Sequence, residues 1–187
     1  MIVTVLRDYV QPQRVIEWAA DHDWKCVADI PRSHVINATI RWVALEGTEI
    51  TYTEDHTADV RTVSFTGRQQ HALQEELQLQ LPCFREDEIL INAESSPDPR
   101  ERIRALNRLA ACRPVEVHHR YLAVWARAFT DPICAVRRAA IRTAHGCTWP
   151  ELEYLIRQRI AQEDRLRPQM ERLIQAIAQA NDPPVTH

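Results

Sequence analysis

Three aspartates at a constant spacing constrain the fold more than any other feature of the sequence. Asp98, Asp131 and Asp164 lie 33 residues apart, and a fixed period in the thirties is typical of stacked helical repeats. In SPDPRERIRAL and TDPICAVRRAA, an Asp-Pro pair is followed at the same offsets by an apolar residue and an arginine. Because Asp accepts hydrogen bonds at a helix start and Pro fits the first helical position, each Asp-Pro predicts the beginning of a helix.

Apolar residues at helical intervals extend this prediction over the second half of the chain. One stripe consists of Val117, Tyr121, Val124, Trp125 and Ala128, and another of Leu152, Leu155, Ile156 and Ile160. Gly146 stands where one helix should end, and Thr148-Trp149-Pro150-Glu151 matches the capping-box pattern. We therefore predict six helices in three hairpins: 85–95 with 99–112, 115–129 with 132–145, and 149–163 with 166–180.

These residues resemble the HEAT repeats, in which a turn Asp is followed six positions later by an Arg on the second helix of the hairpin. Asp98 with Arg104 and Asp131 with Arg137 match that pair. The resemblance implies that these four side chains form a structural ladder between neighbouring hairpins. It covers about residues 85–180 and implies a right-handed α-α superhelix, but it implies no particular activity.

The third unit departs from this pattern. Arg165 replaces the Pro, and Met170 stands where the Arg is expected. A terminal repeat has no following hairpin to pair with, so the loss of the ladder residues is typical of a cap.

The first part of the chain has strand signals instead. Residues 39–43 and 50–53 are β-rich and flank a turn, which predicts a hairpin, and 60–65 predicts a third strand. Residues 2–6 are a possible fourth, and helical stretches at 12–22 and 69–81 flank the strands. We therefore predict a small α+β domain with a meander of three to four antiparallel strands. Residues 48–56 (Thr-Glu-x-x-Tyr-x-Glu-Asp-His) also resemble a segment that precedes the helices in bacterial HEAT-repeat proteins of unassigned function.

Charge supports a two-part organisation. Residues 1–97 carry 8 basic and 16 acidic side chains (net −8), whereas residues 98–187 carry 15 and 10 (net +5). The predicted domains are the α+β domain at 1–82, three repeats within 83–182 and a tail at 183–187. The repeats are 83–112, 113–146 and 147–181.

Composition and cysteine spacing indicate the compartment. No run approaches the roughly 20 apolar residues of a membrane helix, and Arg7 interrupts the start where a signal peptide needs a longer apolar region. The cysteines number five, are widely scattered and form no C-x-x-C pair, which favours free thiols over zinc or redox sites. We expect a soluble, cytoplasmic protein.

Three polar clusters suggest chemistry, but each has a more ordinary interpretation. His118 and His119 are neighbours, so on a helix they point about 100° apart and do not readily bind one metal ion. Glu54-Asp55-His56 lies where a turn should join two strands, and polar residues commonly fill turns. Cys147 follows a predicted helix C-terminus, which does not lower a thiol pKa. We therefore predict no catalytic residue, no metal site and no cofactor.

Arginines recur on equivalent second helices and are the candidate partner-binding residues: Arg100, Arg104, Arg108, Arg137, Arg138 and Arg142. Trp149, at a helix start, is a candidate anchor for a partner. Three interpretations of the arginines stay open: a solvated helix face, a site for an acidic protein segment, and a site for nucleic acid phosphates.

The leading prediction for function is a non-enzymatic protein-interaction module, of an adaptor, regulatory or immunity type, that uses the Arg-rich surface of the second helices. The alternative is a nucleic-acid-binding protein that uses the same basic surface. The overall acidity of the chain and its single lysine, Lys25, weigh against the alternative.

Overall fold

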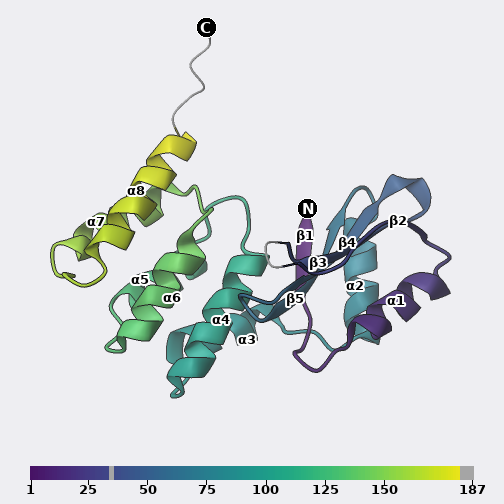
Figure 1. The fold of residues 1–187 in the computed structure, drawn as a ribbon, viewed down its shortest axis with the longest axis horizontal. Coiled ribbons are helices and arrows are strands. Elements are labelled where there is room, and N and C mark those ends of the chain that lie inside the picture. Colours follow the sequence, from purple (N-terminus) through teal and green to yellow (C-terminus); the bar gives the residue numbers. More distant parts are fainter. Residues whose placement is uncertain (34–35, 182–187) are drawn as a thin grey trace, which may run out of the picture. The chain divides into compact units, whose positions relative to one another are not determined.

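The computed structural model describes residues 1–33 and 36–181 and has the predicted α+β fold (Figure 1). The predicted tail, 183–187, lies outside the described residues. The chain divides into two compact units between Glu86 and Asp87; the predicted boundary is at 82 and 83. We call them the sheet unit and the helical unit. Within the described ranges, no helix combines the length and the apolar character that crossing a membrane requires.

The sheet unit contains five antiparallel strands in the order β1-β5-β4-β3-β2. They are β1 (Ile2–Val5), β2 (Lys25–Ile30), β3 (Ala38–Val43), β4 (Glu49–Asp55) and β5 (Val60–Thr66). The predicted meander is β3, β4 and β5, and the predicted fourth strand is β1, which pairs with β5. The edge strand β2 is absent from the prediction, because its residues, KCVADI, show no apolar alternation and are mostly exposed.

Two helices, α1 (Pro12–Asp21) and α2 (Gln70–Gln80), pack on one face of this sheet. Paired residues of neighbouring strands share a face, so Ile50 lies beside both Trp42 and Phe65. The core consists chiefly of Trp42, Ile50, Tyr52, Val63 and Phe65 from the strands and Val15, Trp18, Leu73 and Leu77 from the helices. This apolar layer explains the two helical stretches, each of which buries one side against the sheet.

His22 joins the two helices of the sheet unit. Its Nδ1 lies 2.7 Å from the carbonyl oxygen of Trp18, and its Nε2 lies 2.7 Å from Oε1 of Glu76. Both ring nitrogens therefore face acceptors, which favours the protonated ring. Burial lowers the pKa of His22, but the hydrogen bonds to Trp18 and Glu76 outweigh burial, and the net pKa is raised above 6.5.

We expect the stability of the sheet unit to fall as the pH rises through the raised pKa of His22. A raised folded pKa contributes stability that is fully present below the unfolded value and lost above the folded one. The expected loss is about 0.5 kcal/mol, as for partly exposed pairs. Thermal unfolding followed by tryptophan fluorescence between pH 5.5 and 8.5 measures it. His22→Ala should flatten the pH dependence, whereas the exposed His71→Ala should not; an unchanged His22→Ala profile contradicts the assignment.

The helical unit contains three hairpins that follow one another along the chain (Figure 1). Their helices are α3 (Glu86–Ser95) with α4 (Pro99–Cys112), α5 (His119–Phe129) with α6 (Cys134–Ala144), and α7 (Pro150–Ile160) with α8 (Arg167–Asn181). The second helices pack in series, α4 against α6 and α6 against α8, while α5 packs against α6 and α7. Ion pairs of Asp87 with Arg120 and of Glu94 with Arg127 join α3 to α5. The fully buried Trp125 lies in the core of this stack.

The two Asp-Pro pairs differ in their relation to the helices that follow. Asp98 is the N-cap of α4, where its side chain accepts a hydrogen bond from the backbone of Arg100, as predicted. Asp131 instead accepts from the backbone N–H of Ile133 (2.8 Å), and α6 begins only at Cys134. The starts of α4 and α6, Pro99 and Cys134, are therefore 35 residues apart. The 33-residue echo in the sequence is thus not the structural offset between these two helices.

Other predicted helix boundaries differ in the same unit; α7, for example, ends at Ile160, three residues before the predicted end at 163. α5 begins at His119, four residues after the predicted start. The capping box predicted at Thr148 does not form, because Trp149 is the N-cap residue of α7 and Pro150 is its first residue. The predicted end of α6 near Gly146 is confirmed: the helix stops at Ala144, and Gly146 has a φ of 78°, which glycine adopts without strain.

Candidate functional site

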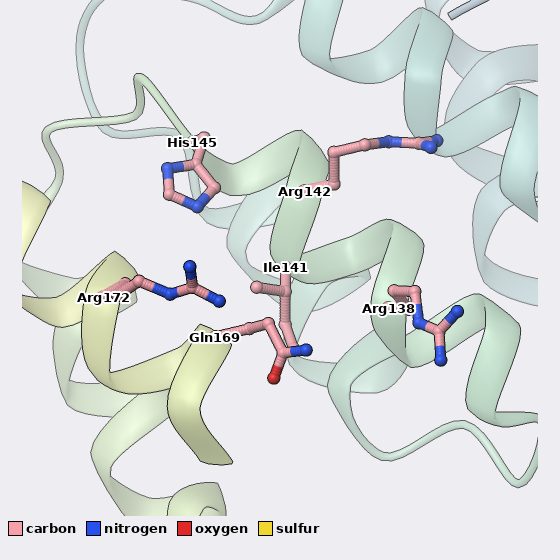
Figure 2. A pocket seen from close by; sticks show the side chains of 6 residues that line it. All are labelled: Arg138, Ile141, Arg142, His145, Gln169 and Arg172. Carbon is pink, nitrogen blue, oxygen red and sulfur yellow. The ribbon is translucent and has the colours of Figure 1, made fainter. Parts of the chain in front are cut away.

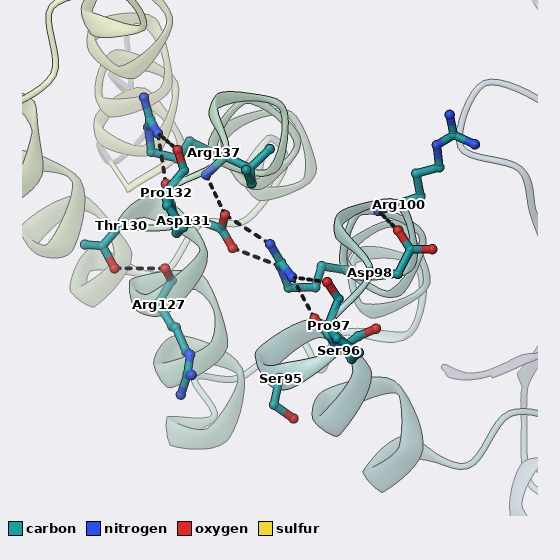
Figure 3. Close-up of polar contacts among 12 residues, drawn as sticks. Ser95, Ser96, Pro97, Asp98, Arg100, Arg127, Thr130, Asp131, Pro132 and Arg137 are labelled. Carbon is teal, nitrogen blue, oxygen red and sulfur yellow. Dashed lines mark hydrogen bonds and ion pairs between the residues drawn. The ribbon is translucent and has the colours of Figure 1, made fainter.

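One arginine at each junction connects a hairpin of the helical unit to the next, and Figure 3 shows the contacts around Asp131 at the first junction. Arg102, on the first turn of α4, donates from Nη1 to the carbonyl oxygen of Ser96 (2.6 Å) and forms an ion pair with Asp131 (Nε to Oδ2, 2.9 Å). Arg137, on the first turn of α6, donates to the carbonyl oxygen of Asp131 (2.8 Å) and pairs with Glu163 (2.7 Å). Each guanidinium thus binds a backbone carbonyl oxygen in the loop before its own helix. It also binds a carboxylate in the loop before the second helix of the following hairpin.

This ladder differs from the predicted one in its residues. Arg104 was expected in the ladder with Asp98, but its side chain is 53% exposed and lies 3.8 Å from Glu101 on the same helix. Arg102 and Arg137 are each the fourth residue of their helix, so the ladder follows the 35-residue helical offset. Asp131 and Arg137 do belong to the ladder, although the side chain of Asp131 pairs with Arg102.

Met170 occupies the same fourth position on α8 and is fully buried. An apolar side chain needs no carboxylate partner, so the ladder ends there. This contact pattern matches the cap expected for the third unit.

Two candidate binding residues, Arg108 and Trp149, are not on an accessible surface. Arg108 is 3% exposed and forms an ion pair with Glu101 (2.6 Å). Trp149 is also 3% exposed; its indole N–H donates to the carbonyl oxygen of Val115 (2.9 Å), and its ring packs against Trp125. Both side chains are part of the packing of the unit. Arg100 is exposed on the first turn of α4.

The remaining candidates, Arg138 and Arg142, line a pocket between α6 and α8 (Figure 2). The pocket has a volume of about 270 Å³ and is lined by Arg138, Ile141, Arg142, His145, Gln169 and Arg172. We call it the α6–α8 pocket. None of its lining residues is acidic. The structure therefore places a cationic hollow on the second-helix side of the unit.

The arginines that line the α6–α8 pocket come from both helices and point in different directions. Arg172 extends from α8 toward Ile141, and Arg142 extends from α6 toward α4 (Figure 2). Nη2 of Arg142 donates to Oδ1 of Asn107 (2.9 Å), which fixes that guanidinium at the α4 side. Nε of Arg172 donates to the carbonyl oxygen of Pro168 (3.2 Å). Within residues 1–33 and 36–181, neither Arg138 nor Arg172 forms an ion pair with a carboxylate.

Arg172, His145 and Gln169 are absent from the predicted site, although the sequence contains a signal for the first of them. Arg138, Arg142 and Arg172 have no acidic residue three or four positions away, whereas Arg104 has Glu101 and Arg157 has Glu153. Pairs at these spacings neutralise each other on a helix. The signal is shared by Arg108 and Arg137, which also have no acidic residue at these spacings but pair with Glu101 and Glu163, so the tertiary contacts are needed to select among the arginines.

The other polar clusters have structural contacts. Asp55 accepts hydrogen bonds from the backbone of Thr57 and Ala58 and so stabilises the turn after β4, and Glu54 pairs with Arg61 (2.7 Å). His118 and His119 stack on each other with ring centres 5.0 Å apart. Among the residues described, no group of three His, Cys, Asp or Glu is arranged to hold a metal ion.

Cys147 is 3% exposed, and burial raises the pKa of its thiol. The same is true of Cys83, whose pKa is raised by burial to about 11. Thiols with raised pKa values form little thiolate at neutral pH and are poor nucleophiles.

Comparison of the chain with protein-family models, with curated proteins and with solved structures gave no match. The case for a function therefore depends on the geometry of the helical unit and of the α6–α8 pocket.

Proposed function

We propose that this chain is a non-enzymatic protein-interaction module whose helical unit is a short HEAT-like stack. It binds an acidic segment of a partner protein on the surface of the second helices, with the α6–α8 pocket at the centre of the contact. The observation that supports this is the position of arginines that lack a carboxylate partner: Arg138, Arg142 and Arg172 gather around one hollow. An adaptor, regulatory or immunity-type role fits such a surface, and the five free cysteines fit a cytoplasmic location.

The distribution of paired arginines favours an acidic protein segment over nucleic acid. On α4, Arg102, Arg104 and Arg108 are each paired with a carboxylate, and on α6 Arg137 is paired with Glu163. A protein that follows a phosphate backbone needs cations along its whole length. Here Arg138, Arg142 and Arg172 lie together at the α6–α8 pocket, and among the described residues of α4 only Arg100 lacks a carboxylate partner. Such a local site suits a short acidic segment.

The arrangement of the hairpins supports a binding role for the same surface. The second helices pack in series and are held by the ladder, so the surface is preorganised before a partner arrives. Preorganisation reduces the free energy that ordering costs on binding. Stacked repeats of this kind are suited to extended or helical partners.

Affinity purification from native cells, with quantification by mass spectrometry, tests this function. We expect the full chain to retain a reproducible protein partner, and we expect the double substitution of Arg138→Ala and Arg172→Ala to reduce recovery by about 10-fold or more, since each charged hydrogen bond contributes about 1.5–3 kcal/mol. Arg157→Ala is the matched control, because Arg157 is 59% exposed but pairs with Glu153 on α7. A partner recovered equally with the double variant would contradict the proposal.

Nucleic acid is the alternative occupant and has a separate test. Binding of duplex DNA at 50 mM salt that is lost in the double variant would replace the protein proposal. The dependence of the DNA affinity on salt would distinguish a contact confined to the α6–α8 pocket from one that runs along the stack. About three phosphate contacts give a slope of log K against log[salt] near −2.7, and more contacts give a steeper slope.

A further inference from the structure

The α6–α8 pocket combines an apolar centre with a cationic rim. Ile141, which lies at the centre of the view in Figure 2, is only 3% exposed. Arg172 and His145 lie on one side of it, and Arg138 and Arg142 on the other. A ligand that satisfies both parts has an apolar body over Ile141 and an anionic end at the rim, because an apolar group gains by leaving water and arginines favour oxyanions.

The size of the pocket limits the ligand to one small group. Its volume of about 270 Å³ lies just below the range of about 300–1,000 Å³ that is usual for small-molecule sites. A single side chain with its terminal group fits this space. An extended peptide would contact the pocket with one residue and the rest of the surface with its neighbours.

The charge of the pocket favours a dianion over a single carboxylate. Arg138 and Arg172 bring two positive charges to it, the charge of Arg142 is held at the α4 side by Asn107, and no carboxylate of the described chain lines it with them. A carboxylate carries one negative charge and two oxygens, whereas a phosphate monoester carries about −1.5 to −2 charges at neutral pH and three acceptor oxygens. Arg138 and Arg172 provide guanidinium donors, and the ring of His145 and the amide of Gln169 add further hydrogen-bonding groups.

Contacts outside the pocket hold part of this rim in place. Arg142 is fixed by Asn107, which is itself 8% exposed, and the aliphatic part of Arg142 lines the pocket while its charge stays at the α4 side. The neighbouring Arg137 is held by Glu163 and by two loop carbonyl oxygens, so it does not compete for the ligand. The ligand therefore meets Arg138 and Arg172 as its main partners.

We propose that the α6–α8 pocket binds a phosphate monoester on an apolar stem, presented as a phosphorylated side chain of the partner protein. This inference rests on the proposed function, because it specifies the group by which the acidic segment is anchored. The stem lies over Ile141, the phosphate oxygens accept hydrogen bonds from Arg172, which extends toward Ile141 in Figure 2, and Arg138 adds positive charge at the other side of the rim.

Small probes test the chemistry of the pocket directly. The full chain, labelled with ¹⁵N, is titrated with phenyl phosphate, methyl phosphate and benzoate, and the amide signals of α6 and α8 are followed by NMR. We expect phenyl phosphate to bind at least about 10-fold more tightly than the other two, since methyl phosphate lacks the apolar body and benzoate lacks the second charge. Arg172→Ala should lower the affinity of the chain for phenyl phosphate by about 10-fold. Arg157→Ala should leave this affinity unchanged. Benzoate binding as tightly as phenyl phosphate, or no saturable shift in α6 and α8, overturns the inference.

Peptides identify the source of the phosphate. One acidic peptide is compared with its central residue as tyrosine, phosphotyrosine or glutamate, by fluorescence anisotropy against the wild type and Arg172→Ala. A preference of about 10-fold or more for the phosphopeptide that is lost in Arg172→Ala supports the inference. Equal binding of the glutamate and phosphotyrosine peptides overturns the inference but leaves the proposed function standing. If phenyl phosphate binds but the phosphopeptide is not preferred over the other two peptides, the pocket is a small-molecule site. That outcome overturns the inference that a partner protein presents the phosphate. A partner recovered from cells independently of Arg138 and Arg172 overturns the proposed function itself.

Discussion

Replacing Arg102 by alanine is expected to lower the free energy of unfolding of the helical unit by about 3 kcal/mol, because removing one member of a buried ion pair leaves the other charge uncompensated. The side chains of Arg102 and Asp131 are 13% and 11% exposed, and the pair joins α4 to the loop before α6. The same guanidinium also satisfies the carbonyl oxygens of Ser96 and Pro97. Urea denaturation followed by far-UV circular dichroism measures the change.

Arg104→Ala is the matched control for this prediction. Arg104 lies two positions further along the same helix, is 53% exposed and contacts Glu101 only at 3.8 Å. Its loss should change the free energy of unfolding by less than about 0.5 kcal/mol, as is usual for surface substitutions. If Arg104→Ala destabilised the protein as much as Arg102→Ala, the ladder described above would be wrong, and the pairing expected from the sequence would be restored.

Glu163→Gln is expected to destabilise the helical unit by about 3 kcal/mol at neutral pH and to reduce its sensitivity to acid. The side chain of Glu163 is 5% exposed and accepts a hydrogen bond from Nε of Arg137 at 2.7 Å. Burial raises the pKa of Glu163, but the hydrogen bond and the charge of Arg137 outweigh it, and the net pKa is lowered below 4.5. A lowered folded pKa contributes stability that is present above the unfolded value and lost as the pH falls through the folded value.

The wild type should therefore lose stability as the pH falls from about 4.5 downward, and Glu163→Gln should lose less over the same interval. Urea midpoints measured from pH 6 to pH 3 give both slopes. Glu171→Gln, at an exposed position on α8, is the control and should keep the slope of the wild type. Identical slopes for Glu163→Gln and the wild type would show that this carboxylate does not couple protonation to folding.

The sequence predicts the helices of the helical unit well, because helix signals are local. The stripe that includes Tyr121 and Val124 is buried on α5, and the stripe that includes Leu152 and Ile156 is buried on α7. The start of α6 is less predictable. An Asp-Pro pair fits both an N-cap with the first helical residue and a turn before a helix, and only the contacts of Asp131 with Ile133 and Arg102 distinguish the two.

The candidate site was predictable in part. Arg138 and Arg142 appear in both the sequence prediction and the α6–α8 pocket. Arg108 and Trp149 do not, because burial depends on what packs against a helix and not on the position within it. Arg172 completes the pocket from α8, which starts 33 residues after α6. The absence of an acidic residue three or four positions from Arg172 was visible in the sequence, but its approach to Ile141 was not.

By itself, the sequence determined the α+β class, the helical hairpins and the opposite charges of the two parts of the chain. These properties depend on residue type and on spacing over a few positions. Only the tertiary structure decided which arginines are neutralised and which remain at the pocket. The deciding pairs, Arg102 with Asp131 and Arg137 with Glu163, join residues 29 and 26 positions apart. The distances in these pairs are fixed only when one hairpin packs on the next.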